Sequence, residues 1–155
     1  MAPRTLTALS LVFALLASTS AVAQTTFDKA TYMRAPAPGQ KKGDTVKGVL
    51  VFDGTAKELQ FVVEKGGVSA FSIKYVAIKS LLYERSAKPR YALGILVAWP
   101  LLFTKSKKHY LTIHYTDPAA TGQFVIVQLD KSNFQVALAT AEAETGKRVE
   151  RVEER

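Results

Sequence analysis

Residues 46–64, VKGVLVFDGTAKELQFVVE, decide the fold class because they predict a β-hairpin. The Asp-Gly dipeptide at 53–54 is typical of a tight hairpin turn between two apolar runs. After the turn, Leu59, Phe61 and Val63 recur at every second position, which is the period of a strand with one buried face. The hairpin predicts a chain that is mainly β.

Segments with a strand pattern continue outward from this hairpin. They are 68–75, 78–83, 109–115 and 123–129. Within 109–115, Leu111, Ile113 and Tyr115 are expected to face inward, and Thr112 and His114 outward. Segment 123–129 (QFVIVQL) is apolar on both faces and predicts a strand that is covered on both sides.

A single helix is expected after the last of these strands. Ser132 or Asn133 can cap it, and Gly146 is a plausible stop. Apolar residues recur at helical spacing at Phe134, Ala137, Leu138 and Ala141. One helix cannot cover a whole open sheet. The expected architecture is therefore an antiparallel, partly open barrel or two-sheet sandwich of about seven strands, closed by one C-terminal α-helix.

The middle of the chain contains thirteen uncharged residues, 91–103, YALGILVAWPLLF. In one interpretation 91–97 is a buried strand that Pro100 ends. In the other the run touches a membrane, where Trp99 would suit the headgroup boundary. Thirteen residues are too few to span a bilayer as one helix, so any insertion would be shallow.

Positive charge gathers around this run. The chain of 155 residues has a formal net charge of +8, and between Lys65 and Lys108 nine basic residues face one acid, Glu84. In a hairpin the two flanks of the run would come together as one cationic edge, which favours an anionic partner. The candidate contact residues are Arg85, Lys88, Arg90, Trp99, Leu101, Leu102, Phe103, Lys105, Lys107 and Lys108.

The chain begins with features of an export signal. Arg4 precedes an apolar stretch and the small residues at 21–23, which predicts a signal peptide over 1–23 and a periplasmic or secreted protein. The alternative is an uncleaved N-terminal membrane anchor. Further domain boundaries are a flexible polar lead-in at 24–45, the folded domain at 46–147 and a charged tail at 148–155. The less favoured alternative for the lead-in is a short edge segment that docks through Phe27, Tyr32 and Met33. The chain has no cysteine and therefore no disulfide.

Nothing in the sequence predicts catalysis or a cofactor. His109 and His114 are five residues apart on a strand, so they should point to opposite faces and cannot share a metal ion unaided. The serines lack a nucleophile-elbow motif, and Gly66-Gly67 predicts a turn with no phosphate-loop residues after it. No base-stacking motif indicates nucleic acid. We interpret the protein as a non-enzyme.

Three segments resemble small exported bacterial proteins with a pleckstrin-homology-like domain. They are FSIKYVAIKSLLY at 71–83, KKHYLTI at 107–113 and AEAETGK at 141–147. The resemblance covers roughly 45–147 and implies a fold of strands followed by one closing helix. Phosphoinositide binders of that fold carry basic residues on the first hairpin loop. Here that loop is 53–57, whose only basic residue is Lys57, so the inositol-phosphate pocket is not expected.

The sequence is compatible with two functions. The first is a binding or scaffold module of the cell envelope that docks to an anionic membrane surface or an envelope protein through the basic edge. The second is a carrier of a small apolar ligand inside the barrel, although a barrel of this size is usually filled by its own side chains. The oligomeric state is not predicted.

Overall fold

The computed structural model describes residues 24–34, 43–87 and 106–152, and these form one sheet and one α-helix. The chain order is β1 (Gln24–Arg34), β2 (Asp44–Asp53), β3 (Glu58–Val63), β4 (Ser69–Lys74), a 3-10 turn η2 (Tyr75–Ala77), β5 (Ile78–Ser86), β6 (Lys108–Thr116), β7 (Gly122–Leu129), α1 (Phe134–Thr145) and β8 (Val149–Val152). The prediction of a mainly β chain with one helix near its C-terminus is confirmed.

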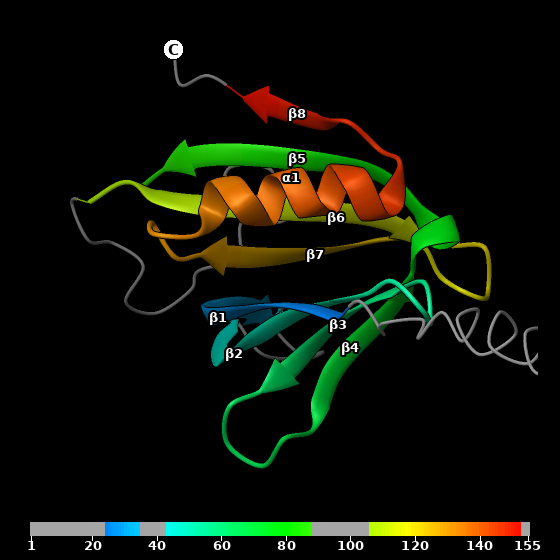
Figure 1. Cartoon of the computed structure of the whole chain (residues 1–155), viewed down its shortest axis with the longest axis horizontal. Helices are drawn as coiled ribbons and strands as arrows, with labels where there is room; N and C mark the ends of the chain where they lie inside the picture. Colours follow the sequence, from blue (N-terminus) through cyan, green and yellow to red (C-terminus); the bar gives the residue numbers. More distant parts are fainter. Residues whose placement is uncertain (1–23, 35–42, 88–105, 153–155) are drawn as a thin grey trace, which may run out of the picture.

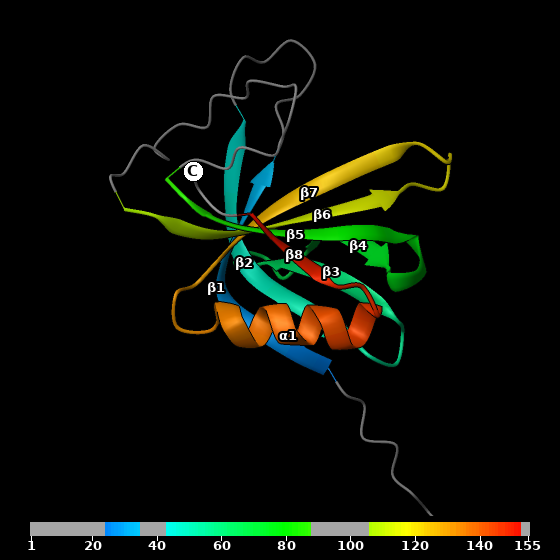
Figure 2. The ribbon, with the colours of Figure 1, turned by 90° about the horizontal axis from the view of Figure 1, so that it is seen from above.

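The eight strands are ordered β4-β3-β2-β1-β7-β6-β5-β8, and the sheet does not close. Every neighbouring pair is antiparallel except β5 and β8, which run parallel. The sheet bends so that β5–β7 and β1–β4 form two layers, with α1 across the side between them (Figures 1 and 2). One continuous, partly open sheet is therefore the observed form of the expected architecture.

Strand β1 corrects the prediction of a flexible lead-in at 24–45. It pairs with β2 along most of its length and with β7 through residues 31–33, so it joins the two layers. The apolar pattern is hidden by a β-bulge between Phe27 and Ala30, where Lys29 has a φ of 58°. The bulge turns both of these residues into the core although they are three positions apart. A strict period of two therefore misses this strand.

The new strand also changes which loop comes first. Residues 53–57 join β2 to β3, and the first hairpin loop is instead 35–43. The prediction that 53–57 is the first hairpin loop is wrong, and the expectation drawn from it about a phosphoinositide pocket stays a prediction. Lys41 and Lys42 of the first loop lie outside the described residues.

Strand β8 corrects the prediction of a charged tail at 148–155. Val149 is buried against the core, and its backbone N–H donates to Oε1 of Glu142, 2.7 Å away. Gly146 ends α1 in the left-handed conformation, with a φ of 66°, and lets the chain turn back toward β5. The parallel ladder with β5, one buried apolar side chain and one hydrogen bond to the helix thus hold a segment whose composition is mostly charged.

The main core lies between the two layers and under the helix. Its fully buried side chains include Leu50, Phe52, Phe61, Ile78 and Leu111. Of the residues predicted to face inward in β3 and β6, Leu59, Phe61, Leu111 and Ile113 are buried in this core and Tyr115 packs against it, whereas Val63 is only half-buried. The helix contributes Ala137, Leu138 and Ala141, as its spacing predicted. Asn133 stands at the N-cap position, but its amide donates to the Asp28 carbonyl instead of capping the helix.

Close packing fixes Gly48 in β2. A Cβ added there would lie 2.2 Å from the Val62 carbonyl oxygen and 2.6 Å from the Phe61 ring. Such distances require the neighbours to move, and one of these neighbours is backbone. The sheet therefore needs a residue without a side chain at this crossing point.

Candidate site at the end of the β5–β6 hairpin

Strands β5 and β6 bring the two basic flanks of the apolar run together. Arg85 pairs with His109, and Ser86 pairs with Lys108, at the end of the antiparallel ladder. Arg85 and Lys107 are exposed, and Lys108 is half-buried. We refer to Arg85, Lys107, Lys108 and His109 as the hairpin end. The predicted convergence of the two basic flanks is confirmed for these residues.

Seven of the ten predicted contact residues lie outside the described residues. They are Lys88, Arg90, Trp99, Leu101, Leu102, Phe103 and Lys105. The proposed strand at 91–97 also lies there.

Three aromatic rings stack beside the hairpin end. The His109 ring lies 3.8 Å from the Phe134 ring at an interplanar angle of 13°, and the Tyr83 ring lies 5.7 Å from Phe134 at 9°. Phe134 opens α1, so the stack ties the start of the helix to two neighbouring strands. The stack gives the site an aromatic base in which Tyr83 is buried and the other two rings are half-buried.

A hydrogen bond fixes the His109 ring within the stack. The Tyr83 hydroxyl and Nδ1 of His109 are 2.7 Å apart. Burial lowers the pKa of His109, and the positive charge of Arg85 lowers it further, while Asp130 acts in the opposite direction. The neutral imidazole is therefore favoured over the imidazolium.

Arg151 of β8 adds a cation that the sequence analysis did not identify. Its guanidinium carbon lies 5.6 Å from the centre of the Tyr83 ring, within the range of a cation–π contact. Burial raises the pKa of Tyr83, and both Arg151 and Arg85 act to lower it, so both cations lie near the phenol. No pattern in an eight-residue charged tail would have paired Arg151 with Tyr83. The parallel ladder does so.

The opposite face of the same strands is polar but buried. Glu84, Ser86, Tyr110 and Thr112 are each at most 8 % exposed, and Thr112 was expected to face solvent. Tyr110 packs with Met33 and Ile126 in a second, smaller core. Among the described residues its hydroxyl has no hydrogen-bond partner, and burial, together with Glu84, raises its pKa to about 12.

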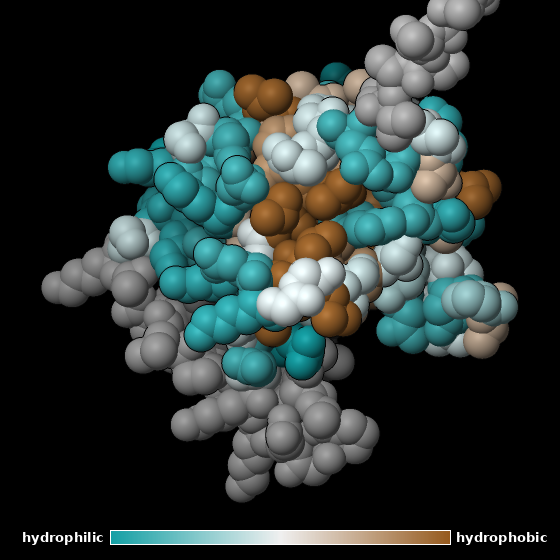
Figure 3. All heavy atoms as spheres, turned by 60° about the horizontal axis from the view of Figure 1, so that its bottom comes forward, coloured by the Kyte–Doolittle hydropathy of each residue, from teal (hydrophilic) through white to brown (hydrophobic). Residues whose placement is uncertain are grey.

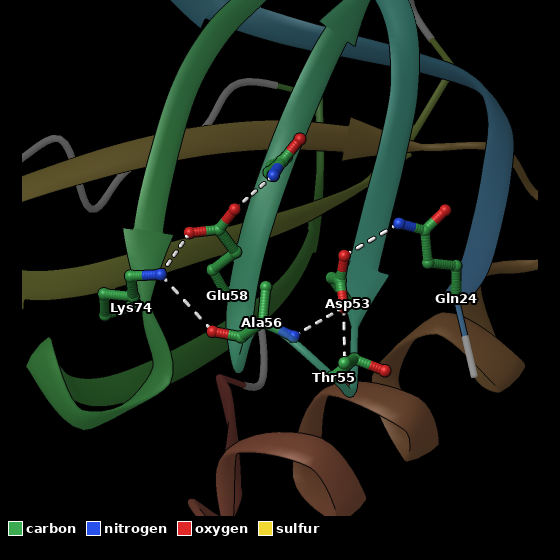
Figure 4. A network of polar contacts seen from close by, with 7 residues as sticks. Gln24, Asp53, Thr55, Ala56, Glu58 and Lys74 are labelled. Atoms are coloured by element: carbon green, nitrogen blue, oxygen red, sulfur yellow. Dashed lines mark hydrogen bonds and ion pairs between the residues drawn. The ribbon is translucent and has the colours of Figure 1, made fainter. Parts of the chain in front are cut away.

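A second polar network lies where β2, β3 and β4 end (Figure 4). Asp53 accepts hydrogen bonds from the backbone of Thr55 and Ala56 and from the Gln24 amide, at 2.7–2.9 Å. Glu58 pairs with Lys74 at 2.7 Å, and Lys74 also donates to the Ala56 carbonyl. These bonds to the backbone hold the β2–β3 turn, so the network is structural.

The two histidines do point to opposite faces. His109 stacks on Phe134 on the helix side, whereas His114 lies near Phe124 on the other side. Over residues 24–34, 43–87 and 106–152, no group of three or more histidines and acids is arranged to hold a metal ion. No helix in these ranges is long and apolar enough to cross a membrane.

Apolar exposure on the described surface is scattered. Val68, Val76 and Val136, the most exposed large apolar residues, come from the β3–β4 turn, η2 and α1. Figure 3 shows a seam of apolar residues between hydrophilic flanks on the lower side of the molecule as oriented in Figure 1. The outward-facing valines Val49 and Val62, paired between β2 and β3, are half-buried. None of these surfaces combines exposure with charge, as the hairpin end does.

Comparison with known proteins gives no family for this chain. No family model matches it, and no curated protein matches it significantly.

Proposed function

We propose that the protein is a non-catalytic docking module that binds an anionic phospholipid membrane through the hairpin end. The observation that supports this most is the pairing of Arg85 with His109 and of Ser86 with Lys108. It joins basic flanks that are about twenty residues apart in sequence into one edge, with the apolar run 91–103 between them in the chain. An anionic leaflet attracts each nearby basic residue by about 1 kcal/mol.

The proposal includes the seven contact residues outside the described ranges. In it, Lys88, Arg90 and Lys105 add charge to the edge, and the segment from Trp99 to Phe103 supplies shallow apolar contact. It also retains export by a signal peptide at 1–23 and kinship with pleckstrin-homology-like domains. The strand order and the helix after β7 support that kinship.

The carrier alternative gains less support. The side chains that point between the two layers fill that space with their own contacts, such as the Phe27–Phe52 and Phe61–Phe71 ring pairs. The core residues Leu50, Phe61 and Ile78 are fully buried. A ligand between the layers would have to displace them.

Co-sedimentation with vesicles tests the proposal. The protein is recovered after export, and its intact mass shows whether residues 1–23 have been removed. We expect it to pellet with phosphatidylglycerol vesicles at low salt and to remain in solution with neutral phosphatidylcholine vesicles. Changing Lys105, Lys107 and Lys108 to Glu should abolish pelleting. Equal recovery of the protein in the supernatant with both vesicle types would contradict the proposal.

A further inference from the structure

The C-terminal strand places Arg151 on the same face as Arg85. Side chains alternate along a strand, and Val149, two residues before Arg151, points into the core on the helix side. Arg151 therefore shares that side and lies over Tyr83, whereas Glu150 takes the other side. The VERV sequence of β8 thus separates its charges and keeps its acid away from the hairpin end.

The ladder brings the two arginines close together. Arg151 pairs with Tyr83 in the parallel ladder, and Arg85 is two residues further along β5 on the same face. The spacing of strands and residues puts their Cα atoms roughly 8 Å apart. The positive charges of both arginines lower the pKa of Tyr83. Arg85 and Arg151, with Tyr83 beside both, form what we call the arginine face.

Within the part of the chain that the structure describes, no carboxylate forms an ion pair with either guanidinium group. Among residues 24–34, 43–87 and 106–152 the one ion pair joins Lys74 to Glu58, at the other end of the strand order. Both arginines are exposed. Asp130, which acts to raise the pKa of His109, accepts hydrogen bonds from the backbone N–H and the hydroxyl of Ser132.

We propose that β8 is part of the membrane-docking surface and that Arg151 and Arg85 together contact phosphate groups of anionic lipids. The guanidinium group presents a planar fork of donors that matches phosphate oxygens in pairs and is more weakly hydrated than an ammonium group. This inference rests on the proposed function and extends it to a residue far from the apolar run. It gives the C-terminal strand a binding role as well as a structural one.

Arg151→Gln tests the inference in the vesicle assay. The variant removes one charge from an exposed side chain and leaves Val149 and its hydrogen bond to Glu142 in place, so the fold should persist. Loss of one contact of about 1 kcal/mol corresponds to a roughly fivefold weaker partition onto phosphatidylglycerol vesicles. Lys65→Gln is the matched control, because Lys65 is exposed in the β3–β4 turn and carries the same charge.

The outcomes separate the inference from the proposed function. A fivefold loss for Arg151→Gln with wild-type binding for Lys65→Gln supports it. If Lys107→Gln with Lys108→Gln weakens binding while Arg151→Gln does not, the hairpin end docks and the role of β8 is wrong. If the unchanged protein does not bind the vesicles, both proposals fail. A circular dichroism melt of each variant shows whether weaker binding merely reflects unfolding.

Discussion

Two corners of the sheet carry charged residues at strand ends and use them differently. Where β2, β3 and β4 end, Asp53 holds a turn and Glu58 pairs with Lys74 at 2.7 Å. Where β5, β6 and β8 meet, Arg85 and Arg151 are exposed, and within the described ranges no carboxylate pairs with either. A charge already paired within the fold offers little to a partner. The second corner is therefore the better candidate for binding.

The basic residues that lie together in the structure differ from those that are close in the sequence. The window from Lys65 to Lys108 looked like one cationic region in the sequence, but Lys74 pairs with Glu58, and Lys65 lies in the β3–β4 turn. In Figure 1 that turn is at the bottom of the molecule and β8 at the top. Arg151 lies outside that window of the sequence but belongs to the arginine face.

The largest expected effect is on stability and comes from a change in β2, the strand that ends at Asp53. Gly48→Ala places a methyl group 2.2 Å from the Val62 carbonyl oxygen, and overpacking of this kind costs about 1–3 kcal/mol. A urea titration should show the free energy of unfolding lowered by an amount near the upper end of that range. Gly122→Ala is the control, since nothing lies within 4 Å of a Cβ there. Equal stability of the two variants would contradict the packing described for β2 and β3.

The two buried tyrosines of the β5–β6 hairpin should respond differently to loss of the hydroxyl. Tyr83→Phe removes the bond to His109 and should lower the free energy of unfolding by about 1 kcal/mol. Tyr110→Phe removes a buried hydroxyl that has no partner among the described residues, so stability should be unchanged or slightly higher. Urea titrations of both variants measure the difference. A larger loss for Tyr110→Phe would show that the far face depends on that hydroxyl.

Acid should weaken the hairpin end through His109. Its pKa in the folded protein is lowered by burial and by Arg85, so the folded state binds fewer protons than the unfolded state. The resulting stability is present above the ordinary histidine pKa of about 6.5 and is lost as the pH falls below it. The thermal midpoint should therefore drop between about pH 7 and pH 5, and drop less in His109→Phe. Parallel curves for the two proteins would exclude His109 as the cause.

The smallest effect is expected for Lys74→Gln. The Lys74 side chain is 60 % exposed, and solvent screens most of its attraction to Glu58. The thermal midpoint should fall only slightly, and partition onto anionic vesicles should stay at the wild-type level. If Lys74→Gln weakened vesicle binding as much as Arg151→Gln does, the two corners would not differ in membrane binding.

Much of the fold could be predicted from local patterns. Alternation located Leu59 and Phe61 of β3 and Leu111 and Ile113 of β6 in the core, and helical spacing with Gly146 located α1. Strands β1 and β8 were missed for physical reasons. The bulge at Lys29 breaks the period of β1, and β8 is too short and charged to show one. Their place in the sheet depends on pairing with β7 and β5, which is long-range information.

The site was predictable only in part. The basic flanks of the apolar run were visible in the sequence, and a hairpin was enough to bring Arg85 and Lys108 together. The Tyr83–His109–Phe134 stack and the position of Arg151 depend on how the helix and β8 return to β5. The spacing of residues in the sequence does not predict where the helix and β8 pack against β5.

The most direct test of the docking role compares two double variants on anionic vesicles. Arg85→Gln with Arg151→Gln removes the arginine face, and Lys47→Gln with Lys65→Gln removes the same charge from exposed positions near the β3–β4 turn. The arginine variant should partition roughly 25-fold more weakly than wild type onto phosphatidylglycerol vesicles, at about 1 kcal/mol per residue, with the lysine variant close to wild type. Equal partition of the two variants would contradict docking through the β5–β6–β8 corner.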